Sequence, residues 1–122
     1  MQLNVNGKTA FVATSGRALE NTRPSIIFVH GAGLDHSVWP LPMRYFVRHG
    51  RNVLAVDLPG HGRSEGPPLS SIESMGDWAA EVLNAAGLEQ AAFVGHSMGS
   101  LVTLAAAARH PQRARALALI GP

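Results

Sequence analysis

Short apolar runs recur along the chain and are separated by longer stretches of mixed polarity. Ile26–Val29 and Val53–Val56 are two such runs, and neither contains a polar side chain. A strand that is buried on both faces, as in a parallel sheet covered by helices, has this composition. The stretches between the runs carry apolar residues at helical spacing and stop at Gly50 and Gly87. The pattern predicts alternating strands and helices, and therefore an α/β fold.

The predicted elements begin with a β-hairpin, because alternating residues flank an Asn6-Gly7 turn. After the hairpin, strands and helices alternate to the end of the chain. This order predicts a three-layer α/β sandwich with a mostly parallel central sheet, formed by residues 1–122 as part of one domain. The predicted strands are Leu3–Val5, Ala10–Ala13, Ile26–Val29, Val53–Val56, Ala91–Val94 and Arg115–Ile120, and the predicted helices are Val38–His49, Ile72–Ala86 and Leu101–Arg109.

Composition excludes several classes of function. The absence of cysteine excludes disulfide frameworks and cysteine nucleophiles, and no cluster of metal ligands or phosphate-binding loop is recognisable, so we expect neither a metal nor another cofactor. The net charge of +2 comes from scattered residues, which argues against nucleic acid or an anionic membrane as a partner. No apolar run approaches the roughly 18 residues of a membrane span, and Met1–Lys8 does not resemble a secretory signal, so we expect a cytoplasmic protein.

The strongest functional motif is the sequence Gly95-His96-Ser97-Met98-Gly99, which matches G-x-S-x-G between a predicted strand and a predicted helix. A serine at so tight a turn adopts a strained backbone, and side chains two residues before and after it would clash. Glycine at both positions relieves the clash and leaves the hydroxyl at the carboxyl edge of the sheet. The alternative interpretation is an ordinary Gly/Ser turn of an α/β domain.

A second motif, His30-Gly31-Ala32-Gly33, follows the predicted strand Ile26–Val29. Acyl transfer needs two hydrogen-bond donors aimed at the oxygen of the tetrahedral intermediate. We expect the backbone amides of Ala32 and Met98 to be these donors. The alternative is a glycine-rich loop that merely turns the chain.

The third motif, Asp57 to Ser64, reads Asp-Leu-Pro-Gly-His-Gly-Arg-Ser and forms a predicted rigid loop at the same edge of the sheet. A carboxylate that opens such a loop commonly accepts hydrogen bonds from local amides, so we favour this role for Asp57 over that of a catalytic acid. We interpret His36 and His61 as loop or surface histidines rather than as catalytic bases.

Together the three motifs resemble the alpha/beta-hydrolase superfamily, and specifically its cytoplasmic group of small serine hydrolases and esterases. The motifs stand in the order of that family, each after the corresponding strand. The resemblance implies that Ser97 is the nucleophile and that Ala32 and Met98 supply the oxyanion-hole amides, supported by His30, Gly31, Gly95 and Gly99. It also implies a small-molecule acyl substrate. By the same comparison, residues 1–122 correspond to the amino-terminal half of the fold, truncated after about the sixth strand, without the cap and the last strands.

The chain departs from the family in lacking an evident triad acid and base after the serine. Residues 98–122 contain no Asp or Glu, and their one histidine, His110, is expected at a helix end. His96 is expected to point away from the serine hydroxyl, because neighbouring positions of a strand face opposite ways.

These departures leave three hypotheses open. The chain is the incomplete part of a hydrolase that cleaves an ester, lactone or related acyl bond; it is a catalytically inactive binding module with the same fold; or it is one chain of a split enzyme. The predicted edge strand Arg115–Ile120 is apolar, so we expect it to self-associate or to receive a complementing chain.

Overall fold

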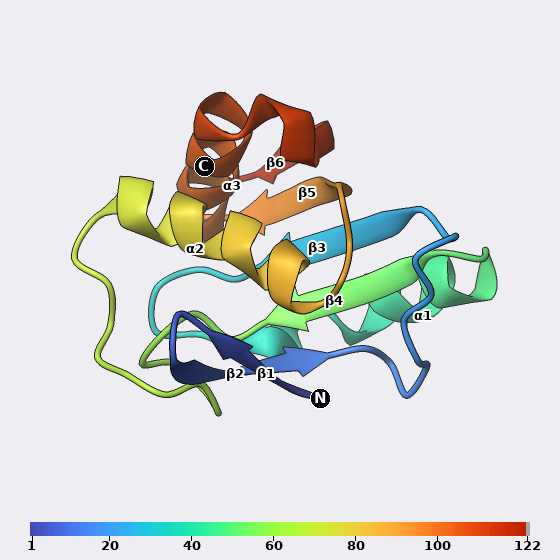
Figure 1. Ribbon diagram of the computed structural model, residues 1–122, viewed down its shortest axis with the longest axis horizontal. Coiled ribbons are helices and arrows are strands. Elements are labelled where there is room, and N and C mark those ends of the chain that lie inside the picture. The colour runs from blue at the N-terminus through green and yellow to red at the C-terminus, as the bar shows by residue number, and fades with distance from the viewer. Residues whose placement is uncertain (122) are drawn as a thin grey trace.

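A computed structural model describes residues 1–121 and contains a six-stranded mixed sheet (Figure 1). The strand order is β1-β2-β4-β3-β5-β6, in which β3 to β6 are parallel and the first two strands are antiparallel to their neighbours. The predicted α/β architecture is therefore confirmed. The strands are β1 (Gln2–Val5), β2 (Lys8–Ala13), β3 (Ser25–Val29), β4 (Asn52–Val56), β5 (Ala91–His96) and β6 (Ala114–Ile120).

Helices cover both faces of the sheet, with α1 (Pro40–Arg48) on one face and α2 (Ile72–Ala85) and α3 (Met98–Arg109) on the other (Figure 1). The side chains of β3 alternate between the two layers, as the pleat of a strand requires. Ile27 belongs to the core cluster beneath α2 and α3, whereas Phe28 belongs to the cluster beneath α1. All residues of β3 and β4 are buried, in agreement with the uninterrupted apolar runs of the sequence.

The hairpin between β1 and β2 forms as the sequence predicts. Asn6 and Gly7 both have positive φ angles, 54° and 81°, the backbone combination of a type I′ turn. β2 then pairs with β4 through Val12 and Ala13, so the hairpin extends the parallel sheet with an antiparallel edge.

Two predicted helix boundaries are wrong at their amino-terminal ends. The helix predicted from Val38 starts only at Pro40, because proline favours the first turn of a helix, and Val38 is the last residue of a short 3-10 turn, His36–Val38. The helix predicted from Leu101 already begins at Met98, and β5 continues to His96. The strand and the helix are therefore separated by a single residue, Ser97.

The outer edge of β6 has no neighbouring strand among residues 1–121. Its side chains are exposed from Arg115 onward, and α3, which packs beside β6, carries the exposed Leu101 and Leu104. The predicted apolar edge strand is thus present. Within the same residues, no helix is both long and apolar enough to cross a membrane.

Candidate active site

Ser97 occupies the turn between β5 and α3, at the carboxyl edge of the sheet. Its φ and ψ angles are 57° and −122°, a conformation that costs a non-glycine residue free energy and is common at functional sites. The turn is fixed on both sides, because the Ser97 N–H donates to the Ile120 carbonyl and the Ser97 carbonyl accepts from the Ser100 N–H at 3.0 Å in each case. Ser97 is exposed although the residues at 99 and 100 are buried, so its hydroxyl is open to a ligand.

The glycines that flank Ser97 allow backbone segments to pack closer than side chains would permit. A Cβ atom at Gly95 would collide with the carbonyl group of Gly99, which confirms the clash expected from the motif. A Cβ atom at Gly99 would collide with the Val29 carbonyl oxygen at the end of β3. α3 can therefore begin directly over the sheet, with the positive end of its dipole at Ser97.

The loop after β3 lies against the serine. A Cβ atom at Gly31 would be 3.1 Å from the Ser97 Cβ atom, so glycine leaves room for this approach. Ala32 follows Gly31 and is exposed, and Met98 follows Ser97 as the first residue of α3. The two residues expected to supply backbone donors are thus on the two segments that meet at the serine.

His30 fixes the start of this loop and is not available as a base. Its ring is fully buried; Nδ1 lies 2.7 Å from the Gly31 carbonyl oxygen, and the Leu58 N–H donates to Nε2 at 3.1 Å. A nitrogen that accepts from an amide carries no proton, so Nδ1 must be the protonated nitrogen and the ring is neutral. Burial lowers the pKa of His30 below 6.5, which maintains this neutral form.

Asp57 fixes the end of the same loop. Its buried carboxylate accepts from the His36 N–H at 2.7 Å, from the His36 Nδ1 at 2.9 Å and from the Arg63 N–H at 2.9 Å. The role expected for Asp57, holding local amides, is confirmed. Sequence reasoning missed the contact with the His36 ring, which joins two loops. We call Asp57, His36 and Arg63 the loop clamp.

The pair of His36 and Asp57 resembles the histidine and acid of a catalytic triad, but the His36 ring lies near β2, several strands along the sheet from the β5 strand that leads to Ser97. The His36 ring packs on Phe11 of β2, with ring centroids 4.9 Å apart. β2 is separated from β5 by three strand spacings of about 4.8 Å, or roughly 14 Å. The ligand atoms of Asp35, His36 and Asp57 lie within 4.8 Å of one another, close enough to consider a cation, but N–H donors already occupy both Asp57 oxygens.

His61 and His110 also have partners other than Ser97. His61 contacts the Pro59 carbonyl oxygen through Nδ1 and packs near His30, as expected for a loop histidine. His110 caps the carboxyl end of α3, and its Nε2 is 2.7 Å from Asp77 on α2. A helix of 12 residues is about 18 Å long, so His110 is far from Ser97.

Asp77 pairs with Arg109 as well as with His110. Hydrogen bonds from Arg109 and then His110 lower the pKa of this exposed carboxyl group to about 2. The sequence predicted the position of His110 at a helix end but not its partner on α2. The contact serves to join α2 to α3 at the surface.

Comparisons with known proteins agree with this fold. Residues 24–122 match the family described as alpha/beta hydrolase fold. The chain is 30% identical to (E)-2-((N-methylformamido)methylene)succinate hydrolase from Acinetobacter baylyi, over 78% of this chain and 36% of that protein. It is 38% identical to 2-hydroxymuconate semialdehyde hydrolase from a Pseudomonas species, over 79% of this chain and 35% of that protein.

Among solved structures, the enol-lactonase from Burkholderia xenovorans superposes with a TM-score of 0.85 and 30% sequence identity, over 96% of this chain and 45% of that chain. The chain spans about a third of the length of the two curated relatives. From the fold, the strand-to-helix turn at Ser97 and the match over residues 24–122, the chain belongs to the alpha/beta hydrolase fold family.

Proposed function

We propose that this chain carries the nucleophile and the oxyanion hole of a serine hydrolase that cleaves an ester, lactone or related acyl bond. The proposal depends on one observation: Ser97 is exposed and has a φ angle of 57° at the start of α3. The loop that contains Gly31 lies beside it. The names of the relatives, two hydrolases and an enol-lactonase, support a small carbonyl substrate.

In the proposed reaction, the Ser97 Oγ attacks the substrate carbonyl carbon and the carbonyl oxygen becomes an oxyanion. The N–H groups of Ala32 and Met98 donate to that oxyanion, and each such donor typically contributes about 3 kcal/mol to lowering the barrier. Collapse of the tetrahedral intermediate expels the leaving group and forms an acyl-enzyme on Ser97, which water then hydrolyses.

A base must accept the Ser97 proton and return it to the leaving group. Residues 98–122 contain no Asp or Glu, and His110 is engaged by Asp77. We propose that the triad acid and histidine come from polypeptide outside residues 1–122, in the same protein or in a complementing chain. The oxyanion hole alone leaves only a small part of the rate acceleration of a complete triad.

We expect a fluorophosphonate to modify Ser97 in the protein as its native source produces it. No Lys or Arg lies between Arg63 and Arg109, so trypsin releases Ser97 in one peptide whose modified serine can be located by mass spectrometry. Ser97→Ala should abolish the adduct. Ser100→Ala is the matched control and should retain it, because it removes the hydrogen bond from the Ser100 hydroxyl to the Ser97 carbonyl and keeps the one from the Ser100 N–H.

An adduct that persists in Ser97→Ala would contradict the proposed nucleophile. Failure to label the native protein would favour the inactive binding module, which the missing acid and base in residues 98–122 support.

We also propose that the free edge of β6 is where a second copy or a complementing chain pairs. We expect the 122-residue chain to elute from a sizing column with a light-scattering mass above 12.9 kDa, because an exposed apolar strand edge promotes pairing. Leu119→Lys should shift it toward monomer. Leu41→Lys, at an exposed position of α1, is the control and should not. A monomer already in the unmodified chain would overturn the expectation.

A further inference from the structure

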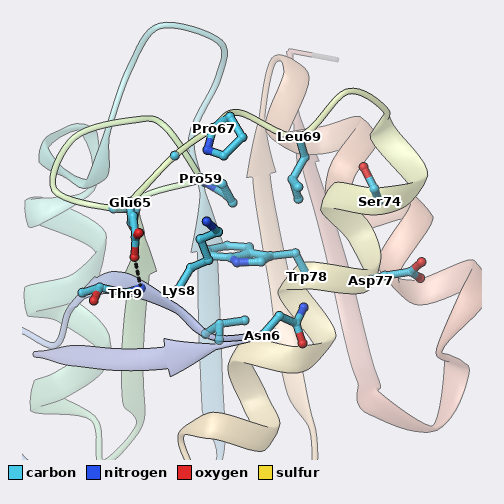
Figure 2. A pocket seen from close by; sticks show the side chains of 13 residues that line it. Asn6, Lys8, Thr9, Pro59, Glu65, Pro67, Leu69, Ser74, Asp77 and Trp78 are labelled. Atoms are coloured by element: carbon cyan, nitrogen blue, oxygen red, sulfur yellow. Dashed lines mark hydrogen bonds between the residues drawn. The ribbon is translucent and has the colours of Figure 1, made fainter.

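A pocket of about 450 Å³ lies between the β1–β2 hairpin, α2 and the loop that joins β4 to α2 (Figure 2). None of the residues that line it belongs to the segments that meet at Ser97. Its walls are mostly apolar and come from Val5, Pro59, Pro67, Leu69 and Trp78. A hollow of this size and composition is typical of a site for a small molecule.

The walls are held in place by contacts between the hairpin and the loop. The Glu65 N–H donates to the Thr9 carbonyl at 2.8 Å, and the Thr9 N–H donates to the Glu65 carboxylate at 2.9 Å. The Ser64 hydroxyl accepts from the Phe11 N–H at 2.9 Å. Trp78, only 5% exposed, supplies a rigid aromatic surface from α2. The pocket is therefore formed before any ligand enters, which reduces the entropy cost of binding.

One positive charge at the pocket lacks a counter-ion. Lys8, the sole lysine of the sequence, lines the pocket together with Trp78 (Figure 2). Among residues 1–121, no carboxylate lies within ion-pair distance of Lys8. The two acidic residues of the lining are otherwise engaged, since Glu65 accepts from Thr9 and Asp77 pairs with Arg109 and His110.

We propose that this pocket binds a small amphipathic carboxylate, whose alkyl or aryl body packs on Trp78, Pro59 and Leu69 while its carboxylate contacts the Lys8 ammonium. The apolar walls match the body of such a molecule, and the unpaired ammonium matches its charge. The site is separate from Ser97 and does not depend on the chemistry proposed there.

Octanoate tests this assignment on the 15N-labelled 122-residue chain. The two tryptophans give separate indole N–H signals in a proton–nitrogen correlation spectrum, and Trp39 lies beneath α1 on the opposite face of the sheet. We expect octanoate to shift the Trp78 signal and not the Trp39 signal, with a dissociation constant on the order of 1 mM.

Charge variants test the contribution of Lys8. Lys8→Gln should weaken octanoate binding roughly fivefold or more and leave binding of neutral octanamide within about twofold. Arg48→Gln is the matched control, because it removes one exposed positive charge on α1, and it should leave the octanoate affinity unchanged.

Three results would overturn the proposal. They are an unmoved Trp78 signal, equal affinity for octanoate and octanamide, and an octanoate affinity that Lys8→Gln does not lower. If octanoate shifts only the amide signals of Gly31, Ala32 and Ser97, it binds at the proposed acyl site. That result would reject the pocket as a carboxylate site and would leave the serine hydrolase proposal unaffected. Phosphonate labelling of Ser97 is independent of all these results.

Discussion

Replacing Gly99 with alanine is expected to lower the free energy of unfolding by about 3 kcal/mol or more. The added methyl group would collide with the Val29 carbonyl oxygen and lie 2.6 Å from the carbonyl oxygen of His30. These atoms cannot easily yield, because β3 is paired on both sides, by β4 and β5. α3 would have to move away from the sheet, and Ser97 would move with it.

Urea denaturation followed by circular dichroism measures the effect of Gly99→Ala. Gly66→Ala is the matched control, because a Cβ atom there would meet nothing closer than 3.5 Å, an ordinary van der Waals distance. It should change the free energy of unfolding by less than about 1 kcal/mol. If the two variants unfolded at the same urea concentration, the close approach of α3 to β3 would not limit stability.

Gly99 also shows why part of the fold could be predicted from the sequence and part could not. The strands β3 and β4 were predictable, because burial on both faces leaves a local apolar run. The start of α3 was placed at Leu101 instead of Met98, and Gly99 is no local sign of a helix, because glycine is unfavourable inside one. The glycine is instead required by the carbonyl of Val29, which is distant in sequence.

The site shows the same division between local and long-range information. Ser97 and its flanking glycines form a local pattern, so the sequence predicted the turn and its exposed hydroxyl. The contact between His36 and Asp57 depends on β3 and β4 being neighbours in the sheet, an order that the sequence does not state. The contact of Asp77 with His110 was missed for the same reason, since it joins two helices.

The second large loss of stability is expected for Asp57→Asn in the loop clamp. This variant removes a buried carboxylate that accepts three hydrogen bonds. An asparagine keeps one acceptor oxygen but presents an amide N–H₂ group where the other oxygen stood, so at least one N–H group of His36 or Arg63 would face a donor. We expect the free energy of unfolding to fall by about 2–4 kcal/mol, measured by urea denaturation.

Asp77→Asn is the matched control for Asp57→Asn, because Asp77 also contacts a histidine and an arginine but is exposed to solvent. Water replaces the lost contacts there, so this variant should lower stability much less. Amide hydrogen exchange then separates stability from positioning. If the clamp holds the loop after β3, exchange at Ala32 and His36 should accelerate in Asp57→Asn and stay unchanged in Asp77→Asn. Unchanged exchange at Ala32 in both variants would mean that His30 and Gly31 alone hold the loop against Ser97.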